Sequence, residues 1–136
     1  MTNKMIEKNE IVNRFNDYLG IEFLGLDEFG CKAMIRIRPE LMNSIEGMVH
    51  GGVTSALADV VMGHGAAPPI NGLQQCVTVE NKMNYLSPAK GSVLFAESKV
   101  IKRGGTLIIM EAQVTTDHGE LVAIATGTYA RVKKSD

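Results

Sequence analysis

The sequence predicts an α+β domain in which an antiparallel sheet wraps around one long helix. Its elements are expected in the order short helix, strand, long helix and then a run of four strands. The last three strands are joined by links of only a few residues, which suit antiparallel hairpins and not the long crossovers of a parallel βαβ fold. With 136 residues, we expect the chain (residues 1–136) to form a single domain with one hydrophobic core.

Two short elements are expected before the long helix. Residues 10–19 carry apolar side chains at helical spacing, and Gly20 ends that helix. Residues 31–38 alternate with the period of two that is typical of a strand, and Pro39 ends the strand. Residues 1–9 mix charged side chains with few apolar ones, so we expect a flexible N-terminal segment there.

The long central helix is predicted over residues 47–67. This stretch is rich in Ala, Leu and Val at helical spacing, and Gly65 and the pair Pro68–Pro69 close it. Four strands follow at residues 75–85, 92–102, 107–116 and 121–132, with turns at Gly104–Gly105 and Asp117–Gly119. The helix therefore lies between one strand and four, at the centre of the expected sheet.

One side of the central helix carries an isolated carboxylate. A helical wheel predicts an apolar side toward the sheet, formed by Val53, Leu57, Val60, Val61 and His64. The opposite side is centred on Asp59, and the residues around it are small: Gly52, Ser55, Ala56, Gly63 and Ala66. Because Asp59 is the only formally charged residue between Gly47 and Val79, we expect a ligand, another subunit or both to cover this side.

A carboxylate on such a surface has two interpretations. Covering it is costly unless it is neutralised or hydrogen-bonded, and perturbed carboxylates are enriched at catalytic sites. Asp59 is therefore a candidate catalytic residue. The structural alternative is a helix aspartate that is hydrogen-bonded across an interface.

The start of the helix has the sequence His50-Gly51-Gly52. Two glycines allow a ligand to approach the backbone, and the unpaired amides at a positive helix end favour an oxyanion or a phosphate. The same glycines also suit a merely flexible helix start. His50 is a candidate base, orienting donor or structural cap.

Composition and charge exclude several classes of partner. Lys and Arg number 14 against 15 Asp and Glu, so the net charge of −1 does not favour nucleic acid or an anionic membrane. The sequence has neither an apolar signal core near its start nor the run of about 18 apolar residues that a membrane span needs. We therefore expect a cytoplasmic protein whose Cys31 and Cys76 are buried or half-buried free thiols.

Several catalytic and cofactor signatures do not occur in the sequence. It contains no GxSxG, GxGxxG or GxxxxGK[ST] pattern, which disfavours a serine hydrolase of that type and a nucleotide-binding fold. His50, His64 and His118 do not have the spacing of metal ligands, and His64 is expected in the core. We expect no metal site and no separate cofactor.

Residues 47–59, with the sequence GMVHGGVTSALAD, resemble the HGG-containing motif of hotdog-fold acyl-CoA thioesterases of the phenylacetate-pathway (PaaI-like) type. That family carries a carboxylate nine positions after the motif His, which is where Asp59 falls. Residues 78–89, 102–106 and 119–128 resemble the family's next strand, its next hairpin and its last strand. The resemblance covers about residues 10–132.

The resemblance implies a hotdog fold and a hydrolase that converts acyl-CoA to the free acid and CoA. It also implies a homodimer or a homotetramer built from two dimers, with active sites at the subunit interface. Coenzyme A is then part of the substrate. The acyl group stays open, and the apolar residues that are candidates for its tunnel are Met48, Met62, Met83 and Leu86.

The family pattern also implies roles for individual residues. Asp59 would be the nucleophile or the general base, the amide of Gly51 or Gly52 would polarise the thioester carbonyl, and His50 would help to hold the site. Thr78 matches a Ser or Thr position near the attacking water. The residues that match contacts to the nucleotide end of coenzyme A are Tyr85, Lys102, Arg103, Gly104 and Thr106.

One position departs from the family pattern. Many members carry Asn or Gln six residues before the motif His, where this chain has Ser44. Asn43, one residue earlier, fills this role if the loop shifts by one residue. If it does not, slow turnover or altered chemistry is expected.

Two other functions on the same scaffold are alternatives. A non-catalytic acyl-CoA-binding or sensory hotdog protein would keep the pocket and would not need Asp59, since a fold does not determine a function. A hydratase or dehydratase would need a closely placed His and Asp pair. His50 and Asp59 lie nine residues apart and about 90° out of phase on a helix, which disfavours that pair within one chain.

Overall fold

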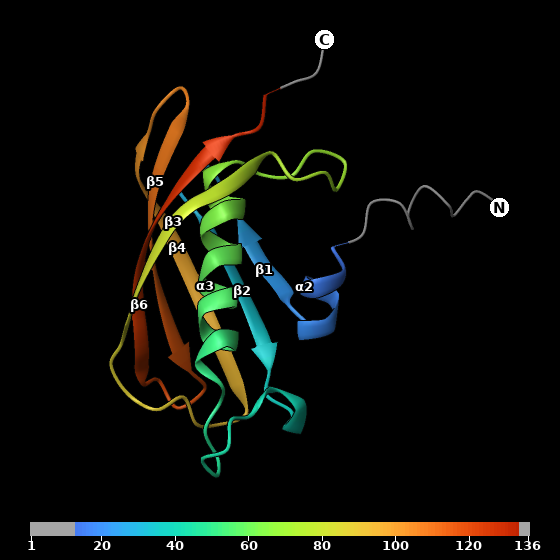
Figure 1. Cartoon of the computed structure of the whole chain (residues 1–136), viewed down its shortest axis with the longest axis vertical. Coiled ribbons are helices and arrows are strands. Elements are labelled where there is room, and N and C mark those ends of the chain that lie inside the picture. The colour runs from blue at the N-terminus through green and yellow to red at the C-terminus, as the bar shows by residue number, and fades with distance from the viewer. Residues whose placement is uncertain (1–12, 134–136) are drawn as a thin grey trace, which may run out of the picture.

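A computed structural model describes residues 13–133, in which one antiparallel sheet of six strands curves around a single long helix (Figure 1). The helical elements are α2 (Arg14–Leu19), the short 3-10 turn η1 (Pro39–Leu41) and α3 (Gly51–Ala66). The strands are β1 (Glu22–Leu26), β2 (Cys31–Arg36), β3 (Cys76–Tyr85), β4 (Val93–Arg103), β5 (Leu107–Thr116) and β6 (Leu121–Arg131). This arrangement confirms the predicted α+β class and the hotdog fold.

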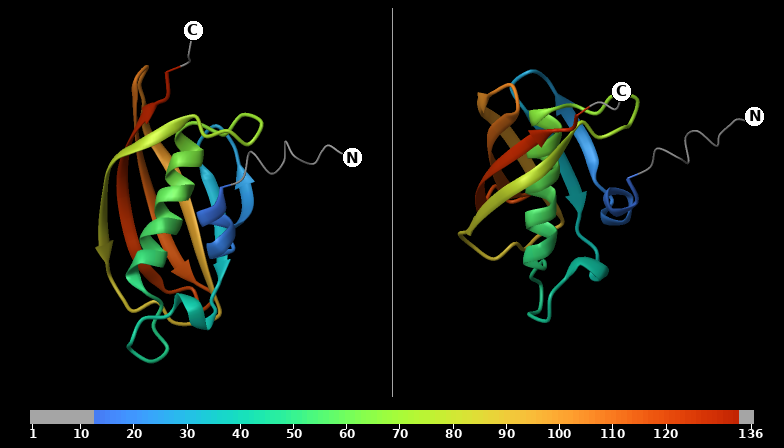
Figure 2. Two further views of the ribbon diagram at one scale, coloured as in Figure 1. Left: turned by 45° about the vertical axis from the view of Figure 1, so that its right-hand side comes forward. Right: turned by 45° about the horizontal axis from the view of Figure 1, so that its top comes forward.

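The strands are ordered β1-β2-β4-β5-β6-β3 across the sheet, and each neighbouring pair is antiparallel. Hairpins join β4 to β5 and β5 to β6, as the short turns predict. The segment that contains α3 separates β2 from β3 in the sequence. In the sheet, β4, β5 and β6 lie between these two strands, and β1 and β3 form the two edges. Figure 2 shows α2 beside β1 and β2, at the end of the sheet away from β3.

Burial along α3 shows how the helix fits the sheet. Its buried residues are Val53, Thr54, Leu57, Ala58, Val61, Met62, Gly65 and Ala66. They pack against the inward side chains of the strands, among them Ile35, Leu94, Ile108, Met110 and Val114. Because the sheet curves around the helix, more than one stripe of α3 is buried.

The predicted wheel is correct for Val53, Leu57 and Val61 and wrong at its margins. Val60 and His64 are only half-buried, and the His64 ring stacks on Phe23 of β1 with 4.5 Å between ring centroids. Ala66, expected on the Asp59 side, is in the core. The curved sheet covers the Thr54–Ala58–Met62 row as well, and this shifts the buried side away from the one that the wheel predicts.

The central helix begins later than the sequence predicts. Gly47 has a left-handed backbone conformation with φ of 76°, which cannot continue into a helix. Val49 then pairs with Met42 in an isolated bridge, and His50 caps the first turn. The helix therefore starts at Gly51 instead of Gly47.

The remaining differences concern short or edge elements. Sequence analysis missed β1, whose five residues are all exposed and whose register shifts between Phe23 and Gly25, so that no alternation marks it. It also missed η1. The ends of the other strands lie within two residues of the predicted ends. The first helix, α2, starts at Arg14. Residues 1–12, which include the predicted start of that helix and the expected flexible segment, lie outside the described part of the chain.

Both thiols are free and buried, as expected. Burial raises the pKa of Cys31 to about 11, and burial together with the charge of Asp59 raises the pKa of Cys76. Both groups are therefore protonated near neutral pH. Within residues 13–133, the helices do not combine the length and the hydropathy that crossing a membrane requires.

The turn between β1 and β2 provides a test of the packing of the sheet. A Cβ atom on Gly30 would lie 1.9 Å from the Ser98 carbonyl oxygen, so Gly30→Ala must displace β4 backbone. We expect it to lower the free energy of unfolding by about 3 kcal/mol. In the matched control, Gly25→Ala, the new methyl group meets nothing within 4 Å. Equal denaturation midpoints for the two variants in urea would contradict this packing.

Candidate active site

The Asp59 carboxylate is half-buried on α3, within reach of side chains from β3 and β6. Its Oδ1 atom accepts three hydrogen bonds, from Thr78 Oγ1 at 2.9 Å, Asn81 Nδ2 at 2.8 Å and Tyr129 OH at 2.8 Å. The described residues donate no hydrogen bond to Oδ2. One oxygen of the carboxylate is thus fully engaged, and the other is open to a ligand.

An irregularity in β3 brings two of these donors together. The register of β3 against β6 shifts between Thr78 and Glu80, which is the mark of a β-bulge. Without the bulge, the alternation of the strand would place Thr78 and Asn81 on opposite faces. With it, both side chains reach Asp59 on α3.

Tyr129 provides the third donor from β6. It is the largest of the fully buried side chains, and its ring packs beside Gly63 of α3. Burial and the neighbouring charge of Asp59 raise the pKa of Tyr129 far above its ordinary value. Its hydroxyl therefore stays protonated and remains a donor at any working pH.

A pocket of about 210 Å³ opens beside Asp59. Residues of α3 and of the N-terminal part of the described chain line it, together with residues around and in β3 and β6. Its lining includes Phe15, Asn16, Val60, Gly63, His64, Gln74 and Cys76. Burial lowers the pKa of His64, which is consequently neutral near pH 7. The pocket beside Asp59 is thus small, and its other lining side chains are uncharged near neutral pH.

At the start of α3, the two motif glycines have different amide environments. His50 Nδ1 accepts a hydrogen bond from the Gly52 amide at 2.8 Å, so His50 acts as the N-cap. Within the described chain, the Gly51 amide donates no hydrogen bond, and the Gly51 carbonyl accepts one from Tyr85 OH at 2.9 Å. Gly51 therefore has the free donor at the positive end of the helix.

A mainly apolar groove of about 560 Å³ adjoins this helix start. Its lining includes Met48, Gly51, Gly52, Tyr85, Leu86, Pro88 and Val122. The groove and the Asp59 pocket lie at different levels of α3. Gly51 and Asp59 are eight residues apart, which corresponds to about 12 Å along a helix axis.

The hairpin between β4 and β5 lies at the other end of α3. Arg103 donates from Nη2 to the Gly65 carbonyl at 2.9 Å and from Nη1 to the Glu28 carbonyl at 3.1 Å, so it caps the C-terminus of the helix. Lys102 beside it is exposed, as is Thr106. A single chain therefore does not bring Tyr85 together with Lys102, Arg103, Gly104 and Thr106.

The loop before the motif holds Asn43 in a local turn. Its Oδ1 accepts a hydrogen bond from the Ile45 amide at 2.6 Å, and its backbone amide donates to the Met48 carbonyl. Asn43 is half-buried, whereas Ser44 next to it is exposed. The carboxamide NH₂ of Asn43 makes no hydrogen bond within residues 13–133 and is available to a ligand.

Sequence analysis did not identify two of the residues that bind Asp59, Asn81 and Tyr129. Strict alternation over residues 75–85 places Asn81 on the outer face, and only the bulge turns it inward. Tyr129 is 70 residues away from Asp59 in the sequence, so no local spacing connects them. The only sequence signal for Tyr129 is its place in a strand expected to cover the helix.

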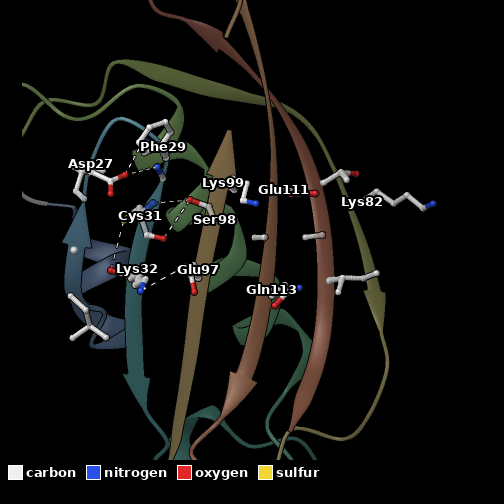
Figure 3. Close-up of a pocket in the computed structure, with 18 of the residues that line it drawn as sticks. Asp27, Phe29, Cys31, Lys32, Lys82, Glu97, Ser98, Lys99, Glu111 and Gln113 are labelled. Carbon is white, nitrogen blue, oxygen red and sulfur yellow. Dashed lines mark hydrogen bonds and ion pairs between the residues drawn. The ribbon is translucent and has the colours of Figure 1, made fainter. Parts of the chain in front are cut away.

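A larger hollow, of about 800 Å³, lies on the outer face of the sheet (Figure 3). Charged side chains from several strands line it, and Lys32 there pairs with Glu97 at 3.7 Å. The Asp59 carboxylate and the start of α3 are not among its lining residues. Across residues 13–133, no cluster of three or more His, Cys, Asp or Glu side chains is arranged to hold a metal ion.

Comparison with known proteins gives a consistent family. The model of the Thioesterase superfamily matches residues 46–123, which include His50, Asp59 and Thr78. A provisionally named esterase of Saccharolobus solfataricus is 28% identical over 134 residues, covering 98% of this chain and 85% of its own. The 1,4-dihydroxy-2-naphthoyl-CoA hydrolase of Listeria monocytogenes is 26% identical over 117 residues, covering 85% of this chain and 94% of its own.

Among solved structures, the E. coli PaaI protein from the phenylacetic acid degradation operon superposes with a TM-score of 0.81. The alignment covers 96% of this chain and 92% of that protein at 18% identity. At this identity the likeness supports the fold alone.

The role of His50 as a cap can be tested by its stability effect. His50→Ala removes the acceptor of the Gly52 amide, and we expect a loss of about 1 kcal/mol in the free energy of unfolding. His50→Asn keeps a cap acceptor and should retain most of the stability. Urea denaturation of the three proteins checks this. A His50→Ala variant as stable as the wild type would show that the cap does not hold the helix start.

Proposed function

Because the chain belongs to the thioesterase superfamily and is a thioester hydrolase, we propose that it is an acyl-CoA thioesterase. The observation that carries this proposal is the Asp59 carboxylate, with one oxygen held by three donors and the other open beside a pocket. The name of the Listeria relative, a CoA hydrolase, supports acyl-CoA as the substrate class. Coenzyme A is part of the substrate, and the reaction needs no separate cofactor.

The free Oδ2 of Asp59 is the reacting atom in either of two routes. As a general base it takes a proton from water, whose oxygen attacks the thioester carbonyl carbon; the C–S bond then breaks and the CoA thiolate takes up the proton. As a nucleophile it attacks the same carbon, the C–S bond breaks and CoA leaves as its thiolate. Water then hydrolyses the resulting mixed anhydride, which releases the free acid, restores Asp59 and supplies the proton that the thiolate takes up. Thr78, 2.9 Å from Oδ1, lies close to the attacking water in the first route.

The carbonyl oxygen of the thioester develops negative charge during the attack. A free backbone amide at a helix N-terminus stabilises such a charge. The Gly52 amide is already bonded to His50, so we assign this role to the Gly51 amide. His50 then acts by holding the helix start, and the free carboxamide NH₂ of Asn43 is a second candidate donor.

The distance between Gly51 and Asp59 requires a second copy of the chain. An attacking group and an oxyanion donor must both lie about 3 Å from the same carbonyl group, yet these two are separated by about 12 Å along α3. We therefore propose that the Asp59 of one subunit acts with the Gly51 amide of the other. The functional unit is then at least a homodimer.

The edge of the sheet at β3 supplies a surface for this pairing. β3 is ten residues long, its outer edge is unpaired in the single chain, and Val77 and Val79 are exposed on it. Such an edge is a template for another strand. If the β3 strands of two copies paired antiparallel around Lys82, then Tyr85 and Gly51 of one copy would lie beside Asp59 of the other.

The same pairing explains the split contacts for the nucleotide end of coenzyme A. In the proposed dimer, the β4–β5 hairpin of one subunit lies past the Asp59 of that subunit along α3. It then adjoins the same site as Tyr85 of the other subunit. Arg103 is occupied by backbone carbonyls, so Lys102 provides the free cation, with Gly104 and Thr106 completing the hairpin. We place this activity in the cytoplasm, where free thiols such as Cys31 and Cys76 stay reduced.

The role of Asp59 predicts a large loss of turnover in Asp59→Asn. Removing the base or nucleophile should lower kcat at least about 100-fold, because the amide cannot accept the proton or form the anhydride. Thiol release from a panel of short, long and aryl acyl-CoA substrates measures it. Asp27→Asn, a matched change at the β1–β2 turn, should keep wild-type turnover. Wild-type activity in Asp59→Asn would refute the proposed mechanism.

Subunit complementation tests the shared site. Gly51→Pro replaces the amide hydrogen by a ring carbon and leaves the backbone conformation allowed, because proline suits the first position of a helix and the His50 backbone (φ −59°, ψ 134°) tolerates a following proline. Gly51→Ala keeps the amide, and its Cβ would meet the Tyr85 ring at an ordinary 3.5 Å.

We expect Gly51→Pro and Asp59→Asn each to be nearly inactive alone and Gly51→Ala to be active. After unfolding and refolding as a mixture, the two inactive variants should recover about a quarter of wild-type activity, because half of the dimers then carry one intact site. No recovery, despite mixed dimers in native mass spectrometry, would show that each site uses one chain only.

A further inference from the structure

The three hydrogen bonds to Asp59 converge on one of its two equivalent oxygens. A carboxylate oxygen has two lone pairs, so three donors within 2.9 Å saturate Oδ1 and leave Oδ2 without a partner in the described chain. The last torsion of an aspartate is otherwise broad. The hydrogen bonds therefore decide which oxygen is presented to a ligand.

Two of the donors are arranged as a rigid support. Tyr129 OH lies 2.8 Å from Asp59 Oδ1, 3.2 Å from the Asp59 carbonyl oxygen and 3.2 Å from Asn81 Oδ1. Asn81 in turn donates to Asp59 Oδ1. Tyr129 has a single hydroxyl proton, and the shortest of its distances is the one to Oδ1, so the three residues form a compact set that ties the Asp59 side chain to β3 and β6.

The Tyr129 hydroxyl has few alternative partners. Tyr129 is only 1% exposed, and it stays protonated because burial and the charge of Asp59 raise its pKa. The other titratable side chains lining the pocket are Cys76, which is protonated near neutral pH, and His64, which is neutral. No cation among the described lining residues competes for the carboxylate.

We infer that Asn81 and Tyr129 are positioning residues that hold Asp59 Oδ1 so that Oδ2 alone reacts. This inference rests on the proposed function of Asp59. Thr78 belongs to the proposed site itself, whereas Asn81 and Tyr129 act through Asp59. Their contribution is to keep Oδ2 in one orientation toward the substrate while Oδ1 is held by their hydrogen bonds.

The test uses variants that remove donors and little else. Tyr129→Phe deletes the hydroxyl and keeps the buried ring, and Asn81→Leu replaces the carboxamide by an apolar group of similar size. Asn84→Leu is the matched control, because it makes the same change on the same strand at a residue that lines the outer-face hollow. Each variant is purified as the full-length oligomer and checked for folding by circular dichroism and thermal unfolding.

Loss of positioning should appear in kcat more than in KM. We expect kcat to fall about tenfold or more in Tyr129→Phe and in Asn81→Leu, since small misplacements of a reacting group have large effects on rate. Asn84→Leu should match the wild type in both measurements.

Two results would overturn the inference while leaving the proposed function intact. One is wild-type kcat and KM in both donor variants, with Asp59→Asn inactive. The other is a fall in thermal stability alone, which would make Asn81 and Tyr129 purely structural. If Tyr129→Phe fails to fold, the exposed Asn81 still decides the question. Activity of Asp59→Asn would instead contradict the proposed function itself.

Discussion

The packing of α3 into the curve of the sheet is the constraint on which the rest of the structure depends. The helix approaches β4 and β5 so closely that a Cβ on Gly65 would lie 2.8 Å from Ser98 Oγ and 2.9 Å from Met110 Cε. Ser98 also donates to the Val61 carbonyl at 2.6 Å and accepts from the Cys31 amide at 3.0 Å, which joins α3, β2 and β4. Rotation and translation of the helix are thereby fixed, and so is the side that carries Asp59.

The charge of Asp59 imposes a second requirement on the fold. A half-buried carboxylate needs donors to replace water, and the surrounding strands supply them through a bulge in β3 and a buried tyrosine from β6. The bulge also interrupts the regular face of an edge strand. The hydrogen bonds that replace water around the carboxylate also orient it. The same residues therefore serve both the stability of the fold and the proposed chemistry.

The rigidity of α3 also explains why the proposed site belongs to two subunits. Gly51 at the start of α3 and Asp59 two turns later keep a constant separation, because the hydrogen bonds of the helix do not allow it to shorten. In the proposed site, a second copy of the chain brings the two groups together. The edge strand β3 runs alongside both groups, since its Tyr85 contacts Gly51 and its Thr78 contacts Asp59.

The sequence alone determined the order of every element except β1 and η1, the antiparallel sheet and the position of the isolated carboxylate, because periodicity and turn residues are local properties. It placed β2 and β3–β6 nearly correctly and singled out His50, Gly51 and Asp59 as candidates. Only the tertiary structure decided that His50 occupies the Gly52 amide and leaves that of Gly51 free. It likewise turned Asn81 inward by a bulge and brought Tyr129 to Asp59 from 70 residues away. These contacts depend on how the sheet curves around α3, and no spacing along the chain encodes that curvature.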